Sequence, residues 1–260
     1  MRVYGFQMDV AWNAPAHNLA HAEAWIRRAA AQGADLVALP EMFATGYSMK
    51  VDRAAGARQE TEAHLQSLAS ELGLAIVAGT AERIPGDAEG RGVNVALAVG
   101  PEGRLGRYEK IHPFSFAGEH HKYRGGEALC TFPFRGVKVG LFVCYDLRFP
   151  EVFRAAADGM DLAIIVANWP EPRRYAWRQL LIARAIECQC FVLGVNRVGE
   201  GGGLVYTGDT LFVDPLGEIL SAAACQEALV GGLVEASQVQ DVRARFPFLS
   251  DRRPEVYRDL

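Results

Sequence analysis

The sequence has few features of a secreted, membrane-spanning or nucleic-acid-binding protein. Its 260 residues contain 5 cysteines, and such an odd, sparse set in a chain of this length is not a disulfide framework. No apolar run approaches the length of a membrane span, and the first residues lack the apolar core of a signal peptide. The 27 basic and 31 acidic residues give a net charge of −4 without a basic block. We therefore expect a reduced, cytoplasmic protein that binds neither membranes nor nucleic acid.

Metal-binding patterns are equally scarce. Cys188 and Cys190 are one residue too close for a zinc knuckle, and no C-x-x-C pair accompanies them. His120 and His121 stand beside Glu119, but adjacent histidines are not a helical ligand pair. We expect no metal and no cofactor, and we interpret Cys188 and Cys190 as core residues.

Strand and helix patterns alternate along the whole chain, and no low-complexity linker divides it. This alternation predicts a single α/β domain over residues 1–260, with helices covering buried sheets. Apolar, β-branched runs predict strands at residues 3–10, 36–41, 74–80, 94–99, 137–143, 162–168, 190–196 and 228–234. Amphipathic or Ala-rich stretches predict helices at residues 18–31, 60–72, 150–157 and 175–189.

Other segments have weaker patterns. Residues 105–110 alternate and predict a hairpin partner for the strand before them, and a D-P-x-G turn predicts a hairpin over residues 210–220. The glycine-rich residues 199–203 are expected to form a flexible loop. The basic, aromatic tail over residues 239–260 is expected to wrap a surface or a partner.

Cys144 lies where a buried strand, residues 137–143, gives way to a helix that begins near Pro150. An α/β protein presents reactive side chains at such strand ends, because the carboxyl end of the strand opens into a crevice. The alternative is that Cys144 is a small buried hydrophobic residue. Asp146 and Arg148 follow closely and are expected to tie the turn with hydrogen bonds.

Glu41 and Lys110 also follow predicted strands, and together with Cys144 they form a chemically complete set. A carboxylate can take the proton of a thiol, whose thiolate is the nucleophile. A lysine ammonium can lower the pKa of that thiol and stabilise the oxyanion formed on attack at a carbonyl. The alternative is that the isolated Glu and Lys are solvated charges.

Three motifs in this order resemble the signatures of the nitrilase, or carbon–nitrogen hydrolase, superfamily. They are L-P-E-M-F at residues 39–43, Y-E-K-I-H at 108–112 and C-Y-D-L-R-F-P-E at 144–151, and the resemblance spans nearly the whole chain. Within the superfamily, residues 39–49, 116–120 and 168–173 resemble the bacterial omega-amidase branch. Those enzymes hydrolyse the terminal amide of 2-oxoglutaramate and 2-oxosuccinamate.

The resemblance implies a four-layer αββα sandwich and commonly a homodimer or larger assembly. It implies that Glu41 is the general base and Cys144 the nucleophile. Lys110 and the backbone N–H of Tyr145 would form the oxyanion site. A second glutamate, Glu119, would orient Lys110 and the substrate; a surface charge or a helix cap is the alternative for this residue.

An omega-amide of a 2-oxo acid carries a distal carboxylate, and its pocket needs a cation and a few polar donors. Arg173 is the first candidate, because its loop follows a strand end; pairing with surface acids or a dimer contact is the alternative. The other candidates near the motifs are Arg174, Trp169, Tyr47 and Tyr123.

The sequence thus indicates an amidase that acts on a small 2-oxo acid omega-amide. Another hydrolase of the superfamily, such as an N-carbamoylase, a nitrilase or a different small-amide amidase, is the alternative. A catalytically silent binding protein of the same fold is the distant alternative. If Cys144 is activated, its depressed pKa should let it alkylate faster than Cys188 or Cys190 at mildly acidic pH.

Overall fold

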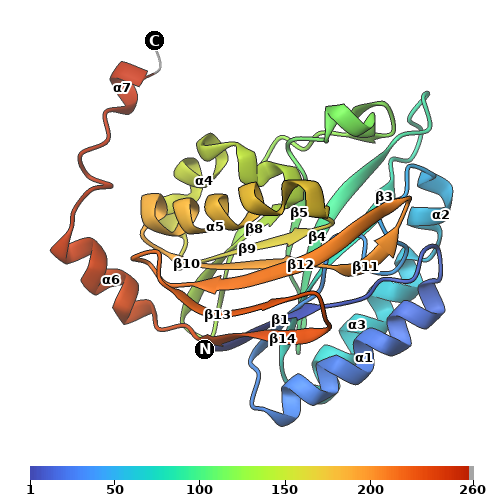
Figure 1. Cartoon of the computed structure of the whole chain (residues 1–260), viewed down its shortest axis with the longest axis horizontal. Helices are drawn as coiled ribbons and strands as arrows, with labels where there is room; N and C mark the ends of the chain where they lie inside the picture. The colour runs from blue at the N-terminus through green and yellow to red at the C-terminus, as the bar shows by residue number, and fades with distance from the viewer. Residues whose placement is uncertain (258–260) are drawn as a thin grey trace.

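Two seven-stranded sheets form the centre of the molecule in the computed structural model, which describes residues 1–257 (Figure 1). The first sheet has the order β14–β1–β2–β3–β4–β5, with β6 paired to β4. Strands β1, β2 and β3 run parallel. The strands of this sheet are β1 (Arg2–Gln7), β2 (Leu36–Ala38), β3 (Ala75–Arg83), β4 (Gly92–Gly100), β5 (Gly103–Glu109), β6 (Tyr123–Arg124) and β14 (Ala228–Leu233).

The second sheet has the order β11–β12–β10–β9–β8–β7, with β13 paired to β12. Strands β8, β9 and β10 run parallel at its centre. The strands of this sheet are β7 (Thr131–Phe134), β8 (Val137–Val143), β9 (Leu162–Ala167), β10 (Phe191–Asn196), β11 (Val198–Gly201), β12 (Leu204–Val213) and β13 (Ile219–Ala224).

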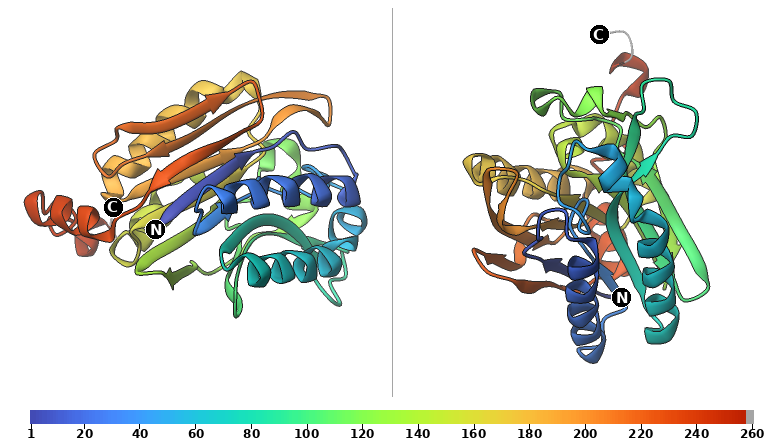
Figure 2. Two further views of the ribbon diagram at one scale, coloured as in Figure 1. Left: turned by 90° about the horizontal axis from the view of Figure 1, so that it is seen from below. Right: turned by 90° about the vertical axis from the view of Figure 1, so that its right-hand side faces the viewer.

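Helices cover the outer face of each sheet. Helices α1 (Pro15–Ala31) and α3 (Arg58–Leu72) contact β1, β3 and β4, whereas α4 (Pro150–Ala156) and α5 (Arg174–Cys188) lie on the other side, with α5 against β10 and β12 (Figures 1 and 2). The result is the αββα sandwich that the family resemblance implied. The inner faces share one apolar core, which contains Val3 and Val77 of the first sheet and Leu141 and Ile164 of the second.

Several short elements were not predicted. They are α2 (Val51–Gly56), α7 (Pro254–Tyr257) and the 3-10 helices η1 (Ser115–Ala117), η2 (Glu119–His121), η3 (Cys144–Arg148), η4 (Ala157–Gly159) and η5 (Glu171–Arg173). Strands β6 and β7 were also missed. Short elements such as these give little periodicity in a sequence.

The prediction of a flexible loop at residues 199–203 is wrong. Strand β11 pairs with β12, from Val198 with Thr207 to Gly201 with Leu204. Gly202 and Gly203 form the two-residue turn between them, with φ of 58° and 78°, because such hairpin turns need positive φ. Here glycine marks a turn in a hairpin and not a loop.

The tail contacts the body of the molecule near α4 and α5, whereas α7 stands away from it (Figure 1). In α6 (Ala236–Arg245), the Arg243 guanidinium donates to the carbonyl oxygens of Ala157, Met160 and Cys188 at 3.0, 2.8 and 3.1 Å. These contacts fit the first part of the prediction that residues 239–260 wrap a surface or a partner. Residues 258–260 lie outside the described residues. Within residues 1–257, no helix is both long and apolar enough to cross a membrane.

Candidate active site

Glu41 lies in a tight turn just after β2, pressed against β3. The Phe43 N–H donates to the Gly79 carbonyl at 3.1 Å, and the Gly79 N–H donates to the Pro40 carbonyl at 3.2 Å. A Cβ on Gly79 would lie 2.3 Å from the Glu41 Cα. Any side chain at residue 79 would therefore push this turn away, so glycine is required there.

Cys144 is the first residue of η3, directly after β8, and has a φ of 47°. Positive φ is strained for a residue with a side chain and is found at functional turns. The buried Asp146 carboxylate stabilises the turn by accepting the Val143 N–H at 3.1 Å, the Tyr108 hydroxyl at 2.9 Å and the His112 N–H at 3.0 Å. The predicted structural role of Asp146 is confirmed.

Lys110 follows β5 and lies between two glutamates. Its Nζ is 2.9 Å from Glu41 Oε1 and 2.9 Å from Glu119 Oε2. All three side chains are buried, at 0–1% exposure. The structure thus brings Glu41, Lys110 and Glu119 together, with the Cys144 thiol in hydrogen-bonding reach of Glu41, and it rules out a surface charge at Glu119.

Further donors complete the environment of the two carboxylates. Asn94 Nδ2 lies 2.7 Å from Glu41 Oε1 and 2.8 Å from Glu119 Oε1. Glu119 also accepts the Tyr47 hydroxyl at 2.8 Å. The Asn168 N–H donates to Glu41 Oε2 at 2.8 Å. We refer to Glu41, Asn94, Lys110 and Glu119 as the Lys110 cluster.

The electrostatics of the Lys110 cluster follow from burial and from opposite charges. Burial alone would lower the pKa of Lys110, but the Glu119 and Glu41 carboxylates raise it well above its usual value. Burial opposes ionisation of Glu119, yet Lys110, the Phe114 N–H and Asn94 lower its pKa overall. At neutral pH, Lys110 therefore stays an ammonium and Glu119 stays a carboxylate.

The expected depression of the Cys144 pKa is wrong for the protein without substrate. Burial and the Glu41 carboxylate raise the pKa of this thiol well above its usual value, and they outweigh the lowering effect of Lys110. Cys188, a fully buried core residue as predicted, has its pKa raised by burial to about 12. The resting thiol of Cys144 is therefore protonated, and its proton needs an acceptor when it reacts.

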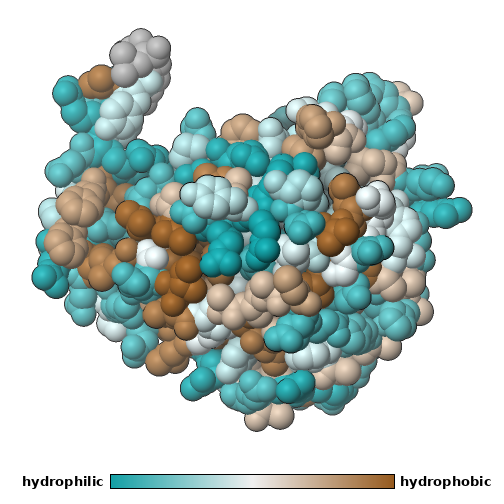
Figure 3. Space-filling view, viewed as in Figure 1, coloured by the Kyte–Doolittle hydropathy of each residue, from teal (hydrophilic) through white to brown (hydrophobic). Residues whose placement is uncertain are grey.

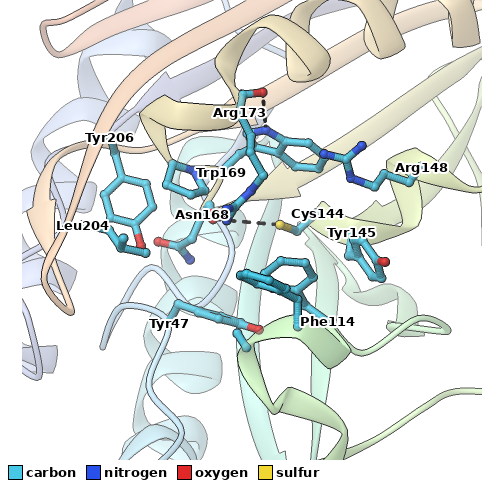
Figure 4. A pocket seen from close by; sticks show the side chains of 13 residues that line it. Tyr47, Phe114, Cys144, Tyr145, Arg148, Asn168, Trp169, Arg173, Leu204 and Tyr206 are labelled. Atoms are coloured by element: carbon cyan, nitrogen blue, oxygen red, sulfur yellow. Dashed lines mark hydrogen bonds between the residues drawn. The ribbon is translucent and has the colours of Figure 1, made fainter.

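A cavity of about 170 Å³ opens at Cys144 (Figure 4). Its size suits a small molecule, since pockets for drug-sized ligands are typically about 300–1,000 Å³. The walls are mostly apolar and aromatic. The lining residues are Tyr47, Phe114, Phe116, Ala117, Cys144, Tyr145, Arg148, Asn168, Trp169, Pro170, Arg173, Leu204 and Tyr206.

Among residues 1–257, two arginines and no acidic residue line this cavity. The Arg173 side chain points into it, with the guanidinium 5.2 Å from the centre of the Phe114 ring (Figure 4). Arg148 lies over the Trp169 indole at 4.9 Å, so its predicted hydrogen-bonding role in the turn is wrong. Within residues 1–257 neither guanidinium forms an ion pair, whereas Arg174 pairs with Asp209 at 2.8 Å.

The other predicted binding residues differ in position. Trp169 and Tyr47 line the cavity, but the Trp169 indole N–H already donates to the Arg173 carbonyl at 2.8 Å. Tyr123 does not line it: this side chain is fully buried among Met42, Val51 and neighbouring apolar residues. Its hydroxyl donates to the Ser48 carbonyl at 2.7 Å. The prediction of Tyr123 as a binding residue is therefore wrong.

The sequence motifs do not identify Asn94 or Tyr206 as site residues, and they include Asn168 only within the segment 168–173. Asn168 follows β9, so the rule of polar residues at strand ends could have identified it. Asn94 lies within β4 and Tyr206 within β12. No local signal distinguishes them, because which face of a strand meets the site depends on sheet packing.

Comparisons with known proteins show which family the chain resembles over nearly its whole length. A model of the carbon-nitrogen hydrolase family matches residues 3–244. The omega-amidase YafV of Escherichia coli (strain K12) is 35% identical over 96% of both chains. The 2-oxoglutaramate amidase of Bacillus subtilis (strain 168) is 33% identical over 96% of this chain and 97% of the relative. A nitrilase of Pyrococcus abyssi is 36% identical over 99% of both.

Solved structures are similar over nearly the whole chain. A CN-hydrolase superfamily protein from Xanthomonas campestris, with an arsenic adduct in its active site, is 37% identical with a TM-score of 0.90, and the match covers 97% of both chains. A mutant amidase from Nesterenkonia sp. AN1, with acrylamide added at its active-site cysteine, is 27% identical with a TM-score of 0.86. That match covers 100% of this chain and 99% of the amidase.

Proposed function

The chain belongs to the carbon–nitrogen hydrolase family, whose relatives here include omega-amidases, and we propose that it hydrolyses the terminal amide of a small 2-oxo dicarboxylic acid monoamide. The substrates would be 2-oxoglutaramate or 2-oxosuccinamate, and the products the 2-oxo acid and ammonia. The observation that carries this proposal is an arginine without an ion-pair partner in residues 1–257, Arg173, which points into the small apolar cavity of Cys144.

In the first half of the reaction, Glu41 accepts the thiol proton while Cys144 Sγ bonds to the amide carbon. The carbonyl oxygen becomes an oxyanion beside the Lys110 ammonium and the N–H of Tyr145, which belongs to the first turn of η3. Glu41 then returns the proton to the nitrogen, the carbon–nitrogen bond breaks, and ammonia leaves a thioester on Cys144.

In the second half, water attacks the thioester. Glu41 accepts a proton from the water, the carbon–sulfur bond breaks, and the Cys144 thiolate takes the proton back. Glu119 holds the ammonium of Lys110 at 2.9 Å and orients it toward the oxyanion. The high pKa of the resting thiol is consistent with this route, because it makes Glu41 the necessary base.

The distal carboxylate of the substrate would pair with Arg173. A guanidinium binds a carboxylate through parallel hydrogen bonds, and the apolar surroundings strengthen this attraction. Tyr47 and Trp169 would serve as walls, because their hydroxyl and indole N–H are already bound to Glu119 and Arg173. The names of the omega-amidase and 2-oxoglutaramate amidase relatives support the same substrate class.

Ammonia release from 2-oxoglutaramate tests the proposal, beside glutamine, asparagine, an N-carbamoyl amino acid and a simple nitrile. We expect rapid release from the 2-oxo amide. Release from another compound with the 2-oxo amide inert would favour a carbamoylase or a nitrilase, and a nitrilase is among the relatives. Release from none would favour the catalytically silent alternative.

Arg173→Gln tests the carboxylate contact. Losing a hydrogen bond to a charged group should raise KM for 2-oxoglutaramate about 10- to 100-fold. KM for an uncharged aliphatic amide of equal length should change little. An equal rise for both amides would contradict this role. Arg174→Gln is the matched control, because Arg174 pairs with Asp209 and does not line the cavity.

A homodimer or larger assembly remains a prediction, supported by exposed apolar residues on α5 and on the β12–β13 hairpin. Ile186 and Leu216 are 51% and 54% exposed, and apolar side chains gather on this face of the molecule (Figure 3). Large exposed apolar patches commonly mark interfaces. Light scattering should therefore give a molar mass larger than that of a single chain. Ile186→Asp should lower this molar mass.

A cytoplasmic location also remains a prediction. All five cysteines are free in the structure, as suits a reducing compartment.

A further inference from the structure

Asn94 contacts all three charged members of the Lys110 cluster. Its side chain is 1% exposed on β4. One amide nitrogen, Nδ2, lies 2.7 Å from Glu41 and 2.8 Å from Glu119. Its backbone carbonyl accepts the backbone N–H of Lys110 at 2.8 Å. The proposed mechanism above gives Asn94 no role.

The Lys110 cluster contains an electrostatic conflict. Two buried carboxylates share one ammonium, at 2.9 Å from each. Like charges held close together in a site away from water tend to take up a proton, which neutralises one of them. A protonated Glu41 could not accept the proton of Cys144. The cluster therefore needs neutral donors that favour both ionised carboxylates.

The amide group of asparagine has the chemistry for this task. It has two N–H bonds on one nitrogen, so it can donate one hydrogen to each carboxylate without adding a charge. A hydroxyl group has a single hydrogen, and a lysine would change the charge of the cluster. Asn94 Oδ1 is buried and has no hydrogen-bond partner in residues 1–257, so the amide group is oriented by the two carboxylates.

We propose that Asn94 is a positioning residue that keeps Glu41 and Glu119 ionised together, and so sets the lowest pH at which Cys144 reacts. The proposal rests on the proposed role of Glu41 as the base. Other titratable groups also face the two carboxylates and are left unchanged in the test. They are Lys110, Tyr47, Tyr123, Cys144 and Tyr206.

The test follows alkylation of Cys144 by iodoacetamide between about pH 4 and pH 8, measured by mass spectrometry of its peptide. Asn94→Leu keeps similar volume and removes both donors. Losing a hydrogen bond to a charged group should move the acid midpoint of alkylation up by about one to two pH units. The acid limb of the pH profile of kcat/KM for ammonia release should shift by the same amount.

Asn18→Leu is the matched control. Asn18 is equally buried and donates to two backbone carbonyls, of Ala11 and Ala44, but it does not contact the Lys110 cluster. Its loss should lower stability and leave the midpoint of alkylation in place. If Asn94→Leu does not fold, Asn94→Ala removes the same donors without added bulk and gives the same readout.

A midpoint for the Asn94 variant equal to that of the wild type would overturn the proposal. So would an equal shift in Asn18→Leu, because the effect would then follow from lost stability. The alkylation readout needs no substrate. Inert 2-oxo amides would therefore refute the proposed substrate and leave this result interpretable.

Discussion

Two ionic clusters of opposite net charge lie in this molecule, and each contains a buried carboxylate. In the Lys110 cluster, two carboxylates share one ammonium, and the ionisable side chains are 0–1% exposed. In the second, which we call the Asp209 cluster, the buried Asp209 carboxylate accepts Arg174 at 2.8 Å, Arg178 at 3.2 Å and the Thr207 hydroxyl at 2.8 Å. Its arginines are 41% and 40% exposed.

The difference lies in where the excess charge is located. The excess positive charge of the Asp209 cluster lies on arginines that reach water, which solvates and screens it. The excess negative charge of the Lys110 cluster has no such outlet, so together with burial, which is the larger cause, its carboxylates raise the pKa of Cys144. We infer that the Asp209 cluster anchors α5 to β12, whereas the Lys110 cluster serves chemistry.

The largest effect is expected at the thiol that the Lys110 cluster serves. Cys144→Ala should abolish turnover and keep the fold, because it removes the nucleophile and little volume. Ammonia release measures turnover, and circular dichroism measures whether the fold is kept. Cys188→Ala is the control: a buried thiol outside the site should keep turnover. Wild-type turnover by Cys144→Ala would refute the proposed nucleophile.

Lys110→Ala should be the next most severe change. It removes an oxyanion donor, at a cost of about 10²- to 10³-fold in kcat. It also leaves two carboxylates buried without their cation, at a cost of about 3–5 kcal/mol in the free energy of unfolding. Steady-state kinetics and urea unfolding test the two effects separately. Loss of stability with unchanged kcat would make Lys110 purely structural.

The Glu119 contribution to stability should depend on pH. Its folded pKa is lowered below the ordinary value of about 4.5, so the folded state favours the carboxylate. The contribution is fully present above about pH 4.5 and is lost as pH falls through the lower folded value. The stability difference between wild type and Glu119→Gln, from urea unfolding, should shrink on acidification. A pH-independent difference would contradict this.

Asp209→Asn should lower stability by about 1–3 kcal/mol, the loss expected for hydrogen bonds to a charged group. Its arginines can turn to water, so no charge is left buried. Thermal unfolding gives the stability, and kcat should stay within a few fold of the wild type. A loss of kcat as large as that of Lys110→Ala would remove the functional distinction between the clusters.

Arg178→Ala should have the smallest effect. Its side chain is 40% exposed and its contact with Asp209 is long, at 3.2 Å, so we expect about 0–1 kcal/mol in unfolding free energy. Asp209 keeps Arg174 and Thr207 as partners. A larger loss would show that both arginines are needed to anchor α5.

Much of the fold was predictable because strand and helix periods are local. The alternating pattern placed the central strands and the main helices, and the rule of polar residues at strand ends identified Glu41, Lys110 and Cys144. The glycines at residues 199–203 predict a loop, because the pairing of β11 depends on the following strand β12 and not on the glycines themselves.

The sequence by itself determined which chemical groups stand at the ends of strands, because each lies directly beside a local apolar run. The tertiary structure decided the rest. It placed Asn94 of β4 between two carboxylates, buried Tyr123 away from the cavity and turned Arg173 into it. It also raised the pKa of the Cys144 thiol. Burial and net charge are sums over groups from both sheets, which no local pattern contains.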